Sequence, residues 1–148
     1  MKTVAFRGGC LTGSGHSSAE LHGFLSYLFK AALNDRRYTI FGYKGKQVRD
    51  QIHSVDVIKA FDEFLLNPKY GAVYNLGGGK ENSVSILESI DRVVQLLGKK
   101  IDYKYSDKNR IGDHICYYTD LTKLKTDYPN WSITRSIDDI FEELAKFY

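Results

Sequence analysis

Two arginines occupy positions from which they could bind a phosphate group. Arg49 lies in the segment KQVRDQIHSVDV, where a short extended stretch passes into a helical pattern, and Arg110 lies in the polar loop SDKNRIGDH. A guanidinium is a planar fork of donors that fits a phosphate in bidentate fashion. Because α/β proteins bind ligands at strand ends and in the loops that follow them, we expect the two arginines to straddle one diphosphate. Each arginine taken alone is typical of a solvated surface charge.

The aspartates beside these arginines could serve either of two roles. Asp50 follows Arg49 directly, and Asp113 comes three residues after Arg110. Each carboxylate could orient a neighbouring guanidinium, and each could equally accept hydrogen bonds from backbone amides. The sequence leaves both roles open.

The glycine-rich segments do not match the known nucleotide-binding loops. NLGGGKENS follows a predicted strand and precedes a predicted helix, as a phosphate loop would. However, Glu81 follows Lys80 where a Walker A loop requires serine or threonine, and Asn82 stands where G-x-G-x-x-G requires its third glycine. The earlier GGCLTGSG has the wrong spacing as well. We therefore interpret NLGGGKENS as a strand-to-helix turn.

Neither a metal site nor a cysteine nucleophile is indicated. The two cysteines, Cys10 and Cys116, lack C-x-x-C spacing, and no two histidines lie four residues apart. We expect no bound metal. Cys10 lies in a glycine-rich loop after a strand, but no histidine close in sequence would activate it, so a buried, unreactive thiol is the preferred interpretation.

The composition is that of one folded domain. The chain has 148 residues, 43% of them hydrophobic and 26% charged, with 11 Tyr, 8 Phe and one Trp. A net charge of +3 with scattered basic residues does not indicate nucleic-acid binding. No apolar run could span a membrane, MKTVAFRGG is too short for a secretory signal, and two cysteines make no disulfide framework. We expect a reduced, cytoplasmic protein.

Strands and helices alternate along the chain, which predicts the α/β class. Apolar spacing predicts helices over residues 19–33, 54–66, 86–97 and from 136 onward, and β-forming residues predict strands at 3–7, 36–42, 47–52, 72–76 and 101–105. Ser54 is expected to cap the second helix, and capping boxes pair Ser85 with Glu88 and Ser136 with Asp139. The segment GGCLTGSGHSS is expected to be a loop, and YPNW a turn. No domain boundary is predicted within residues 1–148.

The order of these motifs resembles a known family. FRGGCLTG, TIFGYKGKQVRDQIHSVDV, VYNLGGGKENSVSILE, NRIGDH and a final S-x-x-D helix together resemble the C-terminal part of nucleotide-sugar epimerases and dehydratases. These enzymes are extended short-chain dehydrogenases that hold NAD on an N-terminal Rossmann domain. The resemblance covers essentially the whole chain. RGGC, HGFLSYL and IFGYKGKQVRD are most similar to the tyvelose branch, which inverts C2 of a CDP-linked sugar through transient oxidation by NAD.

The resemblance implies roles for individual residues. Arg49 and Arg110 match the arginines that grip the nucleotide's diphosphate, with Asp113 in the same loop. Cys10, which stands where the family usually has asparagine, would lie near the sugar. Other matches are to positions that line the base and ribose pocket or that contact NAD: Phe41, Leu21 and His22 for the pocket, and Gly9 and Leu11 for NAD. The helix from Ser54 would pack against the Rossmann sheet, and His53 would be structural.

The resemblance also shows what these residues lack. The family requires a glycine-rich NAD loop and a Tyr-x-x-x-Lys pair, whose tyrosine is the general base. No tyrosine here has a lysine four residues later, and G-x-G-x-x-G is absent. We expect a C-terminal substrate-binding portion, inactive alone, that needs an N-terminal Rossmann chain or forms a homo-oligomer. Alternatives are a 4-epimerase, a 4,6-dehydratase or a decarboxylase of the same family, or a non-catalytic partner chain.

Overall fold

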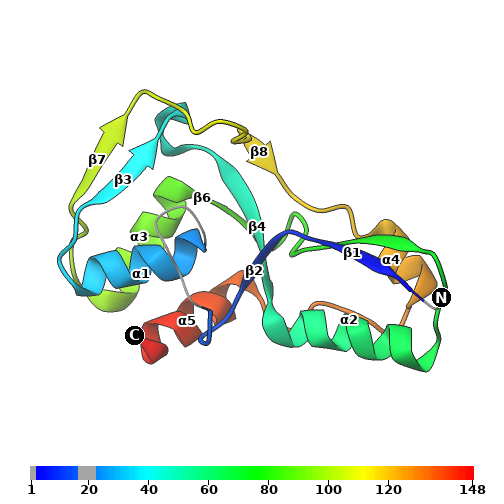
Figure 1. The fold of residues 1–148 in the computed structure, drawn as a ribbon. Helices are drawn as coiled ribbons and strands as arrows, with labels where there is room; N and C mark the ends of the chain where they lie inside the picture. The colour runs from blue at the N-terminus through cyan, green and yellow to red at the C-terminus, as the bar shows by residue number, and fades with distance from the viewer. Residues whose placement is uncertain (1–2, 17–22) are drawn as a thin grey trace.

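The computed structural model describes residues 3–16 and 23–148. It has two lobes, which are joined by the central strand β4 (Val48–His53) (Figure 1). The lobe that we call the α1 lobe contains three helices, a short 3-10 turn and a parallel strand pair: α1 (Phe24–Leu33), α3 (Ile86–Leu97), α5 (Ile137–Phe147), η1 (Tyr43–Gly45), β3 (Tyr38–Phe41) and β7 (Tyr103–Ser106). The β1 lobe contains another parallel strand pair and two helices: β1 (Ala5–Gly8), β5 (Val73–Leu76), α2 (Ser54–Leu66) and α4 (Thr122–Asp127).

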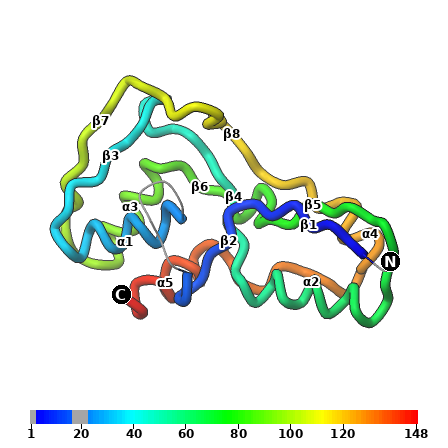
Figure 2. Tube along the Cα trace, viewed as in Figure 1, coloured from blue at the N-terminus to red at the C-terminus, as the bar shows by residue number. Residues whose placement is uncertain are grey.

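Strand β4 also organises a third sheet. β2 (Cys10–Thr12) pairs with it in parallel and places Cys10 opposite Gln51. β6 (Ser83–Ser85) pairs with β4 antiparallel, and β8 (Cys116–Tyr117) pairs with it in parallel. Figure 2 shows the chain passing from β1 directly into β2 at the point where it meets β4. Strands and helices alternate along the chain, so the predicted α/β class is confirmed.

Each lobe has its own apolar core. The core of the α1 lobe is formed where α1, α3 and α5 pack together, with Leu28, Phe29 and Phe141 fully buried. The core of the β1 lobe is more aromatic: the rings of Tyr74 and Tyr128 lie 5.5 Å apart between centroids. Strand β4 runs between the two lobes, so both lobes hold it in place. A ligand bound along β4 would therefore contact a strand that is supported by both lobes.

Two of the three helix N-caps predicted from the sequence are confirmed. Ser85 and Ser136 form the predicted capping boxes with Glu88 and Asp139. The prediction that Ser54 caps α2 is wrong, because Ser54 is the first helical residue and His53 is the cap. The Nδ1 atom of His53 accepts the backbone N–H of Val55 at 3.2 Å, which a ring nitrogen on an extended N-cap residue can reach.

The sequence patterns missed three short strands and one short helix: β2, β6, β8 and α4. GGCLTGSGHSS was predicted to be a loop, but its residues Cys10–Thr12 form β2, and Ser83–Ser85 form β6. Both strands have only three residues, and both pair with β4. They are strands because β4 offers them hydrogen-bonding groups, and their own composition does not predict it. Helix α4 is only six residues long and carries a single buried residue, Leu124, which is too little apolar periodicity to detect.

The outer face of α2 is apolar and exposed. Its inner face buries Val57 and Ala60, whereas Ile58, Phe61 and Leu65 are 57%, 43% and 73% exposed. The apolar residues of α2 therefore form two stripes. Within the described ranges the second stripe is covered only in part, where the Phe61 ring lies 5.1 Å from the Phe6 ring between centroids. Across residues 3–16 and 23–148, no helix is long and apolar enough to cross a membrane.

Candidate functional site

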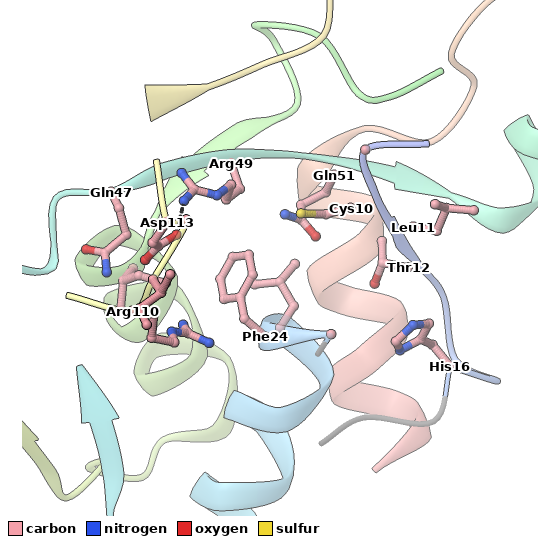
Figure 3. A pocket seen from close by; sticks show the side chains of 16 residues that line it. Cys10, Leu11, Thr12, His16, Phe24, Gln47, Arg49, Gln51, Arg110 and Asp113 are labelled. Carbon is pink, nitrogen blue, oxygen red and sulfur yellow. Dashed lines mark hydrogen bonds and ion pairs between the residues drawn. The ribbon is translucent and has the colours of Figure 1, made fainter. Parts of the chain in front are cut away.

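A cavity of about 780 Å³ lies beside the middle of β4 (Figure 3). It is lined by residues of β2, β4 and the first turn of α1, and by the loop at 110–113. Its two ends differ in chemistry. Arg49, Arg110 and Asp113 gather at one end, and the neutral side chains of Cys10, Gln51 and Thr12 lie toward the other (Figure 3).

Arg49 is held in place at the charged end. Its guanidinium forms an ion pair with Asp113, and its Nη1 donates to the Val48 carbonyl at 2.6 Å. The side chains of Arg49 and Asp113 are only 14% and 15% exposed. Asp113 therefore takes both of its open roles, since it orients the fork of Arg49 and its Oδ1 also accepts the backbone N–H of His114 at 3.1 Å. Its second carboxylate oxygen, Oδ2, is buried and has no hydrogen-bond partner among the described residues.

Arg110 approaches the same cavity from a separate loop. Its guanidinium carbon lies 5.2 Å from the centroid of the Phe41 ring, a cation–π contact. The Nε atom of Arg110 is buried and finds no partner within the part of the chain that the structure describes. Because Arg110 lines the cavity, this donor belongs to a residue that a ligand bound there would contact. Phe41 contacts the Arg110 guanidinium with its ring and is not among the residues that line the cavity.

Asp50 takes only the second of the two open roles, that of accepting hydrogen bonds from backbone amides. It is fully buried, and its Oδ2 accepts the backbone N–H groups of Gly79 and Thr119, each at 3.0 Å. Because successive side chains of a strand alternate, Asp50 lies on the opposite face of β4 from Arg49. Asp50 therefore joins β4 to the turn after β5 and to the segment after β8, and it does not orient the guanidinium.

Cys10 is a neutral thiol in this setting. Burial raises its pKa, the nearby Asp50 carboxylate adds to that rise, and the Gln51 amide and Arg49 oppose it. A thiol with a raised pKa is protonated at neutral pH and is a poor nucleophile. The expectation of an unreactive thiol agrees with this environment, although Cys10 lines the cavity.

The sequence patterns missed several polar residues of the cavity. Gln47, Gln51 and Thr12 line it and are almost fully buried, with exposed fractions of 3%, 2% and 4%. His16 lines it as well, and its Nδ1 has no partner among the described residues. A signal for two of them was present, because positions 47, 49 and 51 alternate along an extended segment and so share one face with Arg49.

Of the remaining residues that the resemblance implied for ligand contacts, two line the cavity and two lie outside the described residues. Gly9 and Leu11, which the resemblance implied for NAD, both line the cavity. Leu21 and His22, which it implied for the base and ribose pocket, lie outside the described residues. Among described residues, no group of three His, Cys, Asp or Glu side chains could hold a metal ion.

The glycine-rich turn at 77–79 does not fit an NAD cradle. A dinucleotide needs a glycine-rich turn with free space above its backbone at a helix N-terminus. The turn at 77–79 leads into strand β6, and its space is taken: a Cβ at Gly78 would overlap the Gln51 carbonyl, and one at Gly77 would overlap Thr119. These glycines allow close packing of backbone against β4. No redox step is therefore assigned to this turn.

His53 connects the site's supporting strand to α5. Since its Nδ1 accepts from Val55, the proton of the neutral ring is on Nε2, which lies 3.1 Å from the Glu143 carboxylate. Glu143 also accepts the Ser14 backbone N–H at 3.0 Å. These contacts give His53 a structural role, tying β4 and the end of β2 to α5.

We expect this contact to make stability depend on pH. The hydrogen bond from His53 lowers the pKa of Glu143 most strongly, and the Ser14 N–H adds to the effect, while burial opposes it. A lowered folded-state pKa stabilises the fold above the ordinary glutamate pKa, and this stabilisation is lost as pH falls, between about pH 5 and pH 3. In urea unfolding, Glu143→Gln should be less stable than wild type at pH 7, and the difference should shrink toward pH 3. Glu142→Gln, at an exposed neighbouring residue that pairs with Lys146, is the control; a difference for Glu143→Gln that does not change with pH would contradict the prediction.

Comparisons with known proteins agree on one family. The model of the "NAD dependent epimerase/dehydratase family" matches residues 1–77. UDP-glucose 4-epimerase of Drosophila melanogaster is 30% identical over 137 residues, covering 85% of this chain and 38% of the relative. CDP-paratose 2-epimerase of Salmonella typhi is 28% identical over 147 residues, covering 94% of this chain and 42% of the relative.

Solved structures show the same fold. UDP-glucuronic acid 4-epimerase from Bacillus cereus, in complex with UDP-glucuronic acid and NAD, superposes with a TM-score of 0.83 at 28% identity. The match covers 99% of this chain and 45% of that one, so the chain spans less than half the length of these relatives. Together with the predicted motifs, these matches show that the chain belongs to the NAD-dependent epimerase/dehydratase family.

Proposed function

We propose that residues 1–148 supply the nucleotide-sugar binding site of an NAD-dependent epimerase that acts on a CDP-linked sugar. The observation that supports this most directly is that Arg49 and Arg110, which are 61 positions apart in sequence (110 minus 49), line one cavity. Two guanidinium groups approaching one space from separate segments suit a ligand with two linked phosphates.

The charges at this end favour a diphosphate. Two arginines face the single carboxylate of Asp113, which leaves one formal positive charge before a ligand binds. The diphosphate linkage of a nucleotide sugar carries two negative charges and would replace part of the hydrogen bonding that Asp113 now supplies. Burial strengthens these contacts, because the side chain of Arg49 is largely withdrawn from water.

A CDP-linked substrate is the finer part of the proposal. It is supported by the RGGC and IFGYKGKQVRD segments and by similarity to CDP-paratose 2-epimerase along 94% of the chain. The second candidate is a UDP-sugar 4-epimerase, which the 30% identity to the Drosophila UDP-glucose 4-epimerase favours. A 4,6-dehydratase or decarboxylase of the same family would bind the same class of ligand.

We assign the redox chemistry to residues outside this 148-residue chain. NAD supplies hydride transfer in this family, but this chain has neither G-x-G-x-x-G nor Tyr-x-x-x-Lys. We propose that a Rossmann polypeptide segment covers the β1 lobe. The exposed stripe of Ile58, Phe61 and Leu65 supports this, as does the β1–β5 pair, because a two-stranded parallel sheet is normally part of a larger one.

A non-catalytic role would leave this chain as the docking partner of a Rossmann subunit. The same exposed stripe favours it. Adding a polypeptide with both motifs and recovering epimerase activity, lost again with Arg49→Ala, would show instead that this chain contributes to the active site. A reduced, cytoplasmic compartment completes the proposal, since both cysteines are free.

Calorimetry tests the ligand class and the base together. CDP and UDP are titrated into the folded 148-residue chain, with circular dichroism confirming the fold. We expect both nucleotides to bind, and CDP to bind more tightly. Tighter binding of UDP would favour the 4-epimerase candidate, and no binding of either nucleotide to folded protein would overturn the proposal.

A further inference from the structure

Gln51 lies at the neutral end of the cavity with an unused hydrogen-bond donor. The residue is 2% exposed, and its Nε2 is buried without a partner among the described residues. Buried polar atoms in proteins are nearly always hydrogen-bonded, so an unpaired donor beside a cavity indicates a group that arrives with a ligand. The Gln51 side chain lies beside Cys10 in Figure 3.

The contact that this amide makes within the described residues is a weak one. Its neighbour is the Cys10 thiol, whose pKa the amide lowers, but a thiol is a weak acceptor. The sheet does not need the side chain, because the Gln51 backbone N–H donates to the Asn82 carbonyl at 2.9 Å and its residue pairs with Cys10 in the β2–β4 ladder.

Gln47 provides a contrast on the same strand face. It also lines the cavity and is also buried, but its Nε2 donates to the Phe41 carbonyl at 3.0 Å. Gln47 therefore fixes the backbone of β3 near the charged end. Of these two buried glutamines, Gln51 is the one whose amide donor is left for a ligand.

The spacing of Arg49 and Gln51 relates them to one ligand. They are two residues apart on β4, so they project to the same side about 6.6 Å apart along the strand. A sugar ring joined directly to a phosphate can span that separation. A diphosphate held by Arg49 and Arg110 would thus place its attached sugar beside Gln51 and Cys10 (Figure 3).

We propose that Gln51 is a specificity-determining residue that donates a hydrogen bond from Nε2 to a hydroxyl oxygen of the sugar. This proposal rests on the proposed function, because it assumes that a diphosphate binds at the charged end of the cavity. Gln51 then distinguishes a nucleotide sugar from the free nucleotide. Cys10, small and neutral, leaves the sugar room to approach the amide.

The test compares a nucleotide with its sugar derivative. Affinities for CDP, CDP-glucose, UDP and UDP-glucose are measured by calorimetry on wild type and Gln51→Met, which keeps the side-chain length but removes the donor. We expect the sugar nucleotides to bind roughly five- to tenfold more weakly to the variant, with CDP and UDP changed less than about twofold. Gln47→Met is the matched control and should change the affinity for nucleotide and sugar nucleotide by the same factor.

A measurement on wild type keeps the proposal testable if Gln51→Met does not fold. The side-chain amide signals of Gln51 in a ¹⁵N–¹H spectrum should shift with CDP-glucose or UDP-glucose and not with CDP or UDP. If sugar nucleotides bind but neither the amide signals nor the Gln51→Met affinities respond selectively to them, the role of Gln51 is overturned and the proposed function stands. If folded wild type binds none of the four ligands, both are overturned.

Discussion

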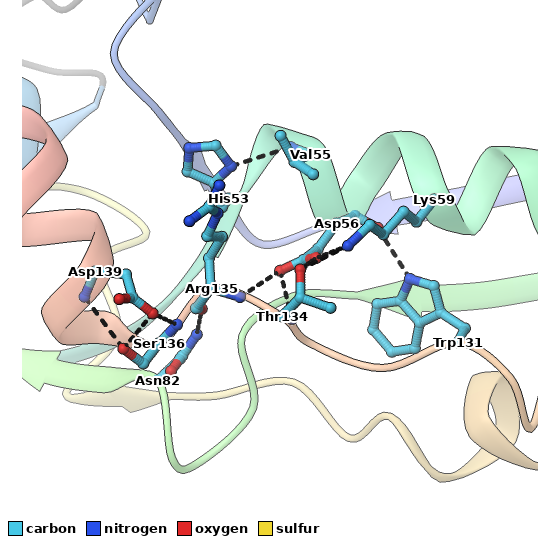
Figure 4. A network of polar contacts seen from close by, with 10 residues as sticks. All are labelled: His53, Val55, Asp56, Lys59, Asn82, Trp131, Thr134, Arg135, Ser136 and Asp139. Carbon is cyan, nitrogen blue, oxygen red and sulfur yellow. Dashed lines mark hydrogen bonds and ion pairs between the residues drawn. The ribbon is translucent and has the colours of Figure 1, made fainter.

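Asp56→Ala is expected to destabilise the fold by about 3–5 kcal/mol, the largest effect that we predict for one substitution. Asp56 is fully buried in the first turn of α2 (Figure 4). Its carboxylate accepts the backbone N–H groups of Thr134 and Arg135 at 3.0 and 3.1 Å and the Thr134 hydroxyl at 2.6 Å. Alanine would leave all three donors without this acceptor.

The network around Asp56 joins α2 to the segment that enters α5. Trp131 Nε1 donates to the Asp56 carbonyl at 2.9 Å, and Lys59 Nζ donates to the Thr134 hydroxyl at 2.7 Å (Figure 4). Because Trp131 is the single tryptophan, its fluorescence reports directly on this contact during urea unfolding. Asp62→Ala, on an exposed position of the same helix, should change stability by less than about 0.5 kcal/mol. A loss below about 1 kcal/mol for Asp56→Ala would show that the carboxylate is not needed.

Arg49→Ala is expected to weaken CDP binding about 10- to 150-fold, provided that the proposed function is correct. Hydrogen bonds to a charged group contribute about 1.5–3 kcal/mol, which corresponds to that range of affinity. The substitution also leaves Asp113 without its ion-pair partner, so a bound diphosphate would face an uncompensated carboxylate. Calorimetry at fixed ionic strength measures the change, since charge-dependent binding varies with salt.

Two further variants separate charge from shape. Arg49→Lys keeps the positive charge but loses the planar fork, so its affinity should fall between those of wild type and Arg49→Ala. Arg37→Ala removes an arginine that is 62% exposed, pairs with Asp102 and does not line the cavity, and it should bind CDP as wild type does. Wild-type CDP affinity in a folded Arg49→Ala would argue against a diphosphate at this end of the cavity.

The sequence by itself determined the elements that depend on near neighbours. The capping boxes at Ser85 and Ser136 were predicted correctly, because the capping residue and its partner are three positions apart. Helix α3 ends at Leu97, as predicted, because Gly98 adopts the left-handed conformation at φ 61° that glycine tolerates. The α/β class followed from the alternation of such local patterns.

Only the tertiary structure decided how distant residues meet. Asp50 directly follows Arg49, and Asp113 lies three residues after Arg110. Of the two aspartates, Asp113 is the one that pairs with Arg49, because the loop before β8 brings Asp113 to β4. Asp50 instead binds two backbone amides on the opposite face. Arg49 and Asp113 are 64 residues apart in sequence, and the pairing of β4 with β8 brings them together. Local composition does not encode that pairing.

The same reason explains the residues that the sequence did not single out. Cys10–Thr12 became a strand because β4 offered it hydrogen-bonding partners, and that pairing placed Cys10 beside Gln51. A glutamine within a strand looks ordinary in sequence, and its significance here comes from burial without a partner at a cavity wall. Helical periodicity and capping depend on residues that are close together in the sequence, so the sequence alone could predict the helices and their caps. A binding site is assembled by packing between distant residues, so it could be identified only in the folded structure.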